Sequence, residues 1–317
     1  MSTEKIKEKI VLEKDDKTPK LDRMMKAIKA VRSHGGTADP TSTESLEKQR
    51  HNQETLSKII TPSANVRYER KTIKDIPVEW AIPKFPYRKD RIILYCHGGG
   101  YTCGGLGYAG ILAGKLALNT GLQVLSFEYR LAPENPYPAA VTDAFTIWDE
   151  LMLKGYGAGE IILAGDSAGG NLALELTLGL KNLKRMLPRG LILMSPWTDM
   201  TLMSETYEEY KELDPMLTYE YVEGVRNAYA GENADFKSPK YSPLFADLKH
   251  MPPTYIQVGT NEILRGDSEK LYIRLKESGV RARLDVYEGG WHVFQQMPTP
   301  RASGAMEDIG RFTESII

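Results

Sequence analysis

The chain has little cysteine, almost no net charge and no long hydrophobic run. Two cysteines in 317 residues cannot form a disulfide framework or a four-thiolate zinc site. The 41 basic and 42 acidic side chains give a formal net charge of −1, which argues against a protein that wraps nucleic acid or coats an anionic membrane. The longest apolar runs, 92–96 and 190–194, have the length of a strand. A membrane-spanning helix needs about 18 or more apolar residues, so we expect no membrane insertion.

Targeting and metal-binding motifs are also missing. The charged start Met-Ser-Thr-Glu-Lys lacks the apolar core of a secretory signal, and the C-terminus carries no lipidation motif. We therefore expect a cytoplasmic protein. No group of His, Cys and Asp residues has the spacing of metal ligands, so we expect no metal and no cofactor. The length allows one large α/β domain with an accessory piece, or two medium domains.

The first sixty residues differ from the rest of the chain. Their apolar residues follow the i, i+3, i+4, i+7 spacing of an amphipathic helix, at Leu21, Met24, Met25, Ile28 and Val31. Gly35-Gly36 ends that pattern, and a second helix is predicted over about 45–59. This composition favours a helix pair packed on a larger body, whereas nothing specific supports a partner-binding arm.

Short apolar runs then alternate with amphipathic segments of helix length. An antiparallel pair is predicted over 66–71 and 78–82, followed by strands over 91–96, 123–127, 161–164, 191–194, 254–258 and 283–286. The predicted helices between them cover 109–119, 139–153, 169–182 and 267–278. This alternation predicts an α/β fold with a mostly parallel central sheet that is flanked by helices on both faces.

One segment interrupts the alternation. Between Pro196 and Pro253 no strand is predicted, and the segment is rich in tyrosine and proline. It is too long for a plain loop. Ligands bind beside the carboxyl ends of parallel strands, so we interpret the segment as a helical insertion that covers such a site.

The most informative motif is Gly165-Asp166-Ser167-Ala168-Gly169, which joins a predicted strand to a predicted helix. Gly-x-Ser-x-Gly in this context is typical of a nucleophile elbow, a sharp turn that has no room for side chains at the glycines. Ser167 is the candidate nucleophile, and the N–H of Ala168 opens the following helix. The alternative is a simple turn, since the motif also occurs by chance.

A glycine loop, His97-Gly98-Gly99-Gly100-Tyr101, directly follows the strand predicted over 91–96. Its uncovered N–H groups can point at a developing oxyanion, so Gly98, Gly99, Gly100 and Ala168 form the predicted oxyanion hole. A flexible turn or a phosphate cradle is the alternative, but no Gly-Lys-Ser/Thr follows. We expect His97 to hold the loop rather than to transfer protons.

These two motifs together resemble the hormone-sensitive-lipase-like family of α/β-hydrolase esterases. The segments 127–140, with Asp143, and 242–259 are also similar to that family, and the resemblance covers roughly residues 65–315. It implies the α/β-hydrolase fold with a helical cap that is built from two parts of the chain. Residues 1–60 then form an N-terminal helical cap segment, and 61–317 form the catalytic domain, in which 197–240 are the inserted cap segment.

Chain order selects the general base among five histidines. His292 follows the last predicted strand, and the order Ser…acid…His is the one expected of this fold. A buried structural histidine is the alternative. The acid, which is the third member of the catalytic triad, departs from the family pattern, because the family has Asp-Pro-Leu where this chain has Glu262-Ile263-Leu264. The resemblance puts Glu262 on the acid position, with Asp267 as the rival. Asp285 is expected to face solvent, and Asp166 is expected to have a structural role.

The sequence thus predicts a serine carboxylesterase that hydrolyses short-chain, acetyl-type esters of small molecules through an acyl-enzyme. Predicted pocket residues are Tyr101, Tyr207, Met216 and Tyr219. The alternatives are a peptidase or amidase on the same fold, and a non-catalytic ligand receptor. The resemblance also allows a homodimer through an edge strand at 283–286 and the C-terminal helix.

Overall fold

The computed structural model describes residues 9–11, 42–59 and 63–317, so the helix predicted around Leu21–Val31 lies outside the described residues. These residues form a nine-stranded sheet of order β1-β9-β8-β7-β6-β4-β5-β3-β2. The strands are β1 (Lys9–Val11), β2 (Val66–Ile73), β3 (Ile76–Pro83), β4 (Arg88–Cys96), β5 (Leu122–Phe127), β6 (Ile161–Asp166), β7 (Gly190–Met194), β8 (Thr254–Gly259) and β9 (Ala282–Tyr287). Only the β2–β3 and β3–β5 pairs among them are antiparallel.

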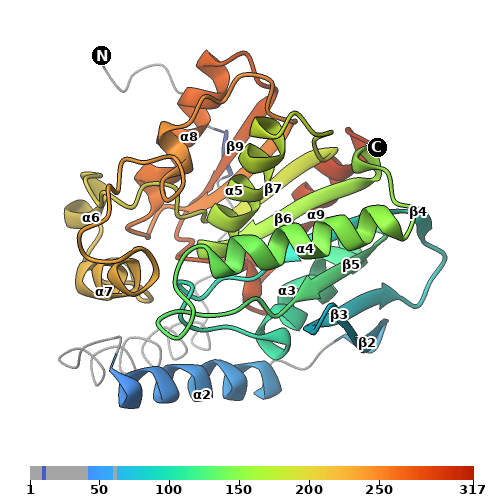
Figure 1. Cartoon of the computed structure of the whole chain (residues 1–317), viewed down its shortest axis with the longest axis horizontal. Coiled ribbons are helices and arrows are strands. Elements are labelled where there is room, and N and C mark those ends of the chain that lie inside the picture. The colour runs from blue at the N-terminus through green and yellow to red at the C-terminus, as the bar shows by residue number, and fades with distance from the viewer. Residues whose placement is uncertain (1–8, 12–41, 60–62) are drawn as a thin grey trace.

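Helices cover both faces of this sheet (Figure 1). The helices are α2 (Thr43–Ile59), α3 (Leu106–Thr120), α4 (Ala139–Leu153), α5 (Ala168–Asn182), α6 (Thr206–Glu209), α7 (Tyr219–Ala230), α8 (Arg265–Glu277) and α9 (Pro300–Glu314). One hydrophobic core joins α4, α5 and α8 to the sheet, and a second joins α3 and α9 to the opposite face. The predicted mostly parallel α/β fold is confirmed, because β5 to β8 are buried along their whole length.

The sheet edge differs from the prediction. β1 pairs in parallel with β9 and aligns Lys9 with Asp285, so β9 is not an edge strand. The three residues of β1 form too short a run to be recognised as a strand from the sequence. Asp285 is also buried rather than exposed. It accepts a hydrogen bond from the Tyr255 hydroxyl at 2.6 Å and pairs with Arg283, which also reaches Asp308 on α9.

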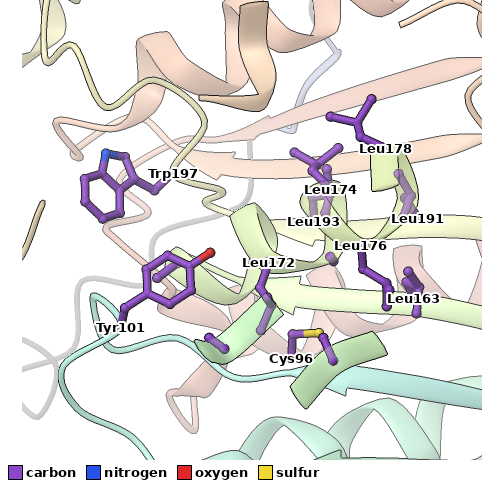
Figure 2. Close-up of a cluster of buried hydrophobic side chains, with 14 of the residues drawn as sticks. Cys96, Tyr101, Leu163, Leu172, Leu174, Leu176, Leu178, Leu191, Leu193 and Trp197 are labelled. Carbon is purple, nitrogen blue, oxygen red and sulfur yellow. The ribbon is translucent and has the colours of Figure 1, made fainter. Parts of the chain in front are cut away.

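The packing of α5 fixes the position of the turn that precedes it. Figure 2 shows the leucines of α5 against the strands of the sheet, with Leu172 and Leu176 near Cys96 and Leu163. Burying a leucine side chain contributes about 1.5–3 kcal/mol, so this row of contacts holds the whole helix on the sheet. The N-terminal end of α5, directly after Ser167, is thereby held at the carboxyl end of β6.

The loops after β4, β6, β8 and β9 meet at the carboxyl ends of the strands, where α2 and α7 lie at the same end of the molecule (Figure 1). The segment between β7 and β8 contains α6, α7 and a short 3₁₀ turn but no strand, as the sequence predicts. No helix within the described ranges is long and apolar enough to span a bilayer.

Candidate active site

Ser167 occupies a strained turn between β6 and α5. Its φ angle is +53°, a region that side-chain-bearing residues rarely adopt. A Cβ added to Gly165 would lie 2.2 Å from the Gly169 carbonyl oxygen, and one added to Gly169 would lie 2.1 Å from the Cys96 carbonyl oxygen. Both contacts are with backbone atoms that cannot rotate away. Gly165 is therefore required for the tightness of the turn itself, and Gly169 for the close approach of the turn to the start of the glycine loop.

The structure brings Ser167, His292 and Glu262 into one hydrogen-bonded row. The Ser167 Oγ lies 2.9 Å from His292 Nε2, and His292 Nδ1 lies 3.0 Å from Glu262 Oε2. Glu262 is fully buried and His292 is nearly so. In this arrangement the imidazole can take the serine proton on one nitrogen while the carboxylate orients it through the other.

The carboxylate of Glu262 is held by two further donors. The Ser195 hydroxyl donates to Glu262 Oε1 at 2.9 Å, and the Gly259 N–H donates to the same oxygen at 2.6 Å. Ser195 in turn accepts the Val293 N–H at 3.2 Å, next to His292. Ser195 is not among the residues predicted from the sequence. Its position directly after β7 was the available signal, because that places it at the strand ends where the site lies.

Asp267, the rival acid, binds elsewhere. Its Oδ2 accepts the N–H groups of Thr198 and Asp199, both at 2.8 Å. Burial, together with the nearby charge of Asp199, raises the pKa of Asp267 to about 8. The side chain therefore anchors the loop after β7 to the start of α8, and it is mostly uncharged at neutral pH.

The predicted oxyanion donors divide into two groups. The N–H of Gly98 donates to Asp166 Oδ1 at 2.8 Å, so it is already engaged and we remove Gly98 from the prediction. Gly99 and Gly100 line the same cavity as Ser167, and Ala168 is the first residue of α5. The first N–H groups of a helix have no acceptor within that helix, so the N–H of Ala168 is free of the helix ladder.

Asp166 and His97 hold the glycine loop. The hydroxyls of Tyr95 and Tyr108 donate to the Asp166 carboxylate, beside its bond to Gly98. His97 is fully buried and stacks on Tyr129 with ring centroids 4.2 Å apart. Burial lowers the pKa of His97 to about 4, so its ring is neutral at pH 7. Both placements agree with the structural roles expected from the sequence.

A cavity of about 330 Å³ opens at Ser167 and His292. Met216 lines it, as predicted, together with Leu217 and residues of α2 and α7. Tyr101, Tyr207 and Tyr219 are not among its lining residues, and we withdraw them. Tyr101 is fully buried and stacks on Tyr229 with ring centroids 3.7 Å apart, while Tyr207 packs edge-on against Tyr219. The Tyr101–Tyr229 stack joins the main body to the insertion, whereas Tyr207 and Tyr219 contact each other within the insertion, where Tyr219 is exposed.

In the described ranges, no group of three or more His, Cys, Asp and Glu side chains is arranged to hold a metal ion. The two cysteines, Cys96 and Cys103, are buried and unpaired.

Comparisons with known proteins identify the family of this chain. A family model described as an alpha/beta hydrolase fold matches residues 93–296. An esterase of Acinetobacter venetianus is 38% identical over 228 residues, which span 71% of this chain and 75% of that protein. A solved esterase of the bacterial hormone-sensitive lipase family has a TM-score of 0.86 at 33% identity, covering 96% of this chain and all of that one. The chain belongs to the hormone-sensitive-lipase-like family of α/β-hydrolase esterases.

The reaction class of this esterase follows from its relatives. An acetyl-hydrolase of Streptomyces hygroscopicus is 31% identical over 244 residues, which span 76% of this chain and 80% of that protein. Together with the Acinetobacter esterase, it identifies the protein as a carboxylic-ester hydrolase. The predicted enzyme class is confirmed, and the receptor alternative is set aside.

A further acid, Asp214, lies beside the site of this esterase and is not among the residues predicted from the sequence. Asp214 is fully buried, and its Oδ2 accepts the N–H of Ile263, next to Glu262, at 2.9 Å. Its Oδ1 accepts the N–H groups of Met216 and Leu217 at 2.7 and 2.9 Å. Asp214 thus connects the cavity wall to the segment that carries Glu262. Nothing in its local sequence distinguishes it from an acid in a turn before proline.

Proposed function

We propose that this esterase is a serine carboxylesterase for short-chain, acetyl-type esters, with Ser167, His292 and Glu262 as its catalytic triad. The observation that carries the proposal is the row of hydrogen bonds from Ser167 Oγ through His292 to Glu262. The small cavity at Ser167, about 330 Å³, lies at the lower end of the range for ligand pockets and suits a short acyl group. The similarity to an acetyl-hydrolase supports the same substrate class.

The mechanism follows from these distances. His292 Nε2 takes the proton of Ser167 as its Oγ attacks the ester carbonyl, and Glu262 stabilises the imidazolium that forms. The N–H groups of Gly99, Gly100 and Ala168 stabilise the oxyanion. Each such donor contributes about 2.7–4 kcal/mol to the transition state. His292 then protonates the leaving alcohol and activates the water that hydrolyses the acyl-enzyme.

The cap is part of this proposal. Side chains of α2, including Gln49 and Gln53, line one wall of the cavity, and Tyr221 and Val225 of α7 line another. We assign α2 and 197–240 to a split cap that limits the length of the acyl chain, and the remainder of 61–317 to the catalytic domain. The predicted cap segment 1–60 needs one correction, because β1 within it pairs with β9 in the central sheet. The cytoplasmic location and the homodimer stay predictions.

Substrate class is tested with a series of p-nitrophenyl esters and one matched amide. We expect kcat/KM to be highest for acetate or butyrate and to fall steeply for decanoate, because the cavity at Ser167 is small. The p-nitroanilide of the preferred acid should be turned over far more slowly than its ester. An amide that is turned over as fast as the ester would favour the amidase alternative, and a preference for decanoate would contradict the short-chain assignment.

The pKa of His292 sets the acid limb of the pH–rate profile. Burial lowers this pKa, but the hydrogen bond and charge of Glu262, with the charges of Asp214 and Asp166, outweigh burial and leave it raised. Activity should be lost as the pH falls through this raised pKa, because the imidazolium cannot accept the Ser167 proton.

Replacing Asp214 should move that limb in a defined direction. In Asp214→Asn one negative charge near His292 is removed, so the His292 pKa falls and the acid limb of kcat/KM shifts to lower pH. The matched control is Glu220→Gln, an acid that lines the cavity but does not contribute to the His292 shift. A shift of the Asp214→Asn limb to higher pH would contradict this electrostatic account.

A further inference from the structure

A second cavity lies away from Ser167, where α4 and α5 pack together and the chain segment 239–247 crosses them. Its volume is about 350 Å³, and it shares no lining residue with the cavity at Ser167. Figure 1 shows α4 and α5 on the same face of the sheet. This second cavity plays no part in the ester hydrolysis described above.

The feature that distinguishes this second cavity is Glu175. It lines the cavity from α5, yet its side chain is only 6% exposed. Its Oε1 has no hydrogen-bond partner, and in the described part of the chain no lysine or arginine pairs with it. The neighbouring hydroxyl of Tyr229 lacks a well-formed hydrogen bond as well. Burying a carboxyl oxygen without a hydrogen-bond donor costs free energy, so Glu175 would gain from a ligand that donates to it.

The other walls fit the apolar part of such a ligand. Phe145 and Val141 of α4 and Leu178 of α5 supply hydrocarbon and aromatic surface. Tyr137 lies at the rim, where the ammonium of Lys240 sits 5.7 Å from its ring centroid and 4.6 Å from that of Tyr241. The aromatic faces at the rim therefore already stabilise one ammonium group.

We propose that this second cavity binds a small primary amine with an apolar body. The ammonium donates to Glu175, and the body packs against Phe145 and Val141. An amine fits better than an anion because Glu175, the buried acid in the lining, has an oxygen without a hydrogen-bond partner. Burial raises the pKa of Glu175 well above its usual value, and Tyr229 offsets only part of the rise. An ammonium partner would lower this pKa again, because a nearby cation favours the ionised carboxylate.

Other charged groups at the rim limit where the amine can lie. Asp247 pairs with Lys181 at 3.1 Å, so their charges largely cancel. Lys240 is exposed and is the chain's own competitor for Glu175. Its charge also opposes the approach of a second ammonium, so removing it should strengthen the binding of an amine.

The proposal is tested with benzylamine and the full-length protein, by calorimetry and by ligand-observed NMR at pH 7. Benzylamine should bind saturably, and benzyl alcohol about tenfold more weakly or less, because it lacks the charge. The Glu175→Gln variant should weaken benzylamine binding about tenfold or more, whereas the exposed Glu277→Gln control should not. Binding should persist in Ser167→Ala, which separates this cavity from the esterase site.

Two further variants keep the test independent of the folding of Glu175→Gln. Val141→Phe fills the cavity and should abolish binding, and Lys240→Gln removes the competing cation and should tighten binding by about twofold or more. Absent binding to the unmodified protein, or binding that is equal in the wild type and Glu175→Gln, would overturn the proposal. Binding that Lys240→Gln leaves unchanged or weakens would place the amine elsewhere and overturn it as well.

Discussion

Replacing Ser167 with alanine is expected to lower kcat for p-nitrophenyl acetate by about 10⁴-fold or more, with no loss of folded protein. The variant removes only the oxygen that lies 2.9 Å from His292 Nε2, while the backbone of the turn and the packing of α5 remain. Steady-state hydrolysis gives the rate, and a thermal melt followed by circular dichroism gives the stability.

The matched control is Ser303→Ala on the exposed side of α9, which should change neither rate nor melting temperature appreciably. Retained hydrolysis in Ser167→Ala, at a rate close to that of the wild type, would mean that another group is the nucleophile. If Ser167→Ala did not fold, Ser167→Cys, which keeps a side chain of similar size, would replace it in the test, after its melting curve has shown that it is folded.

Replacing Glu262 with glutamine is expected to lower kcat/KM by about 10³–10⁴-fold. Glutamine has nearly the same shape, but it carries no charge to stabilise the imidazolium of His292. A glutamine amide also has only one acceptor oxygen, whereas both carboxylate oxygens of Glu262 accept hydrogen bonds. Oε1 accepts from Ser195 and Gly259, and Oε2 accepts from His292. An amide that turns its NH₂ toward any of these donors breaks the arrangement that sets the imidazole tautomer.

The comparison variant is Asp267→Asn, which should change kcat/KM by only about twofold to fivefold. Burial and Asp199 raise the pKa of Asp267 to about 8, so the wild-type side chain is already mostly neutral at pH 7. An asparagine oxygen can still accept the N–H groups of Thr198 and Asp199. The opposite ranking, with Asp267→Asn nearly inactive and Glu262→Gln nearly normal, would assign the acid role to Asp267.

The nucleophile and most of the central sheet can be predicted from the sequence because local motifs encode them. Ser167 was predicted because an elbow needs glycines at fixed positions, and the Cβ contacts of Gly165 and Gly169 give the steric reason. The strands β5 to β8 are predictable because they are buried along their whole length and therefore read as continuous apolar runs. Those predictions depend on neighbouring residues alone, and the mostly parallel sheet is confirmed.

Contacts between distant residues account for the errors. The N–H of Gly98 is engaged by Asp166, 68 residues away, and no pattern near Gly98 announces that bond. The buried position of Asp285 depends on β1, Tyr255 and α9. The pocket tyrosines are misassigned because an aromatic residue near the site packs as well into the protein interior as against substrate. Tyr101 and Tyr229 show this, since they stack on each other.

The most direct test of the central claim is covalent labelling with a fluorophosphonate probe, read by intact mass and by peptide mapping. We expect the wild-type protein to gain one adduct, located on Ser167, because only a serine activated by His292 attacks the probe rapidly. Glu262→Gln should label far more slowly, and Ser167→Ala should not label. A single adduct on another residue, or no adduct on an enzyme that still hydrolyses p-nitrophenyl acetate, would contradict the proposed mechanism.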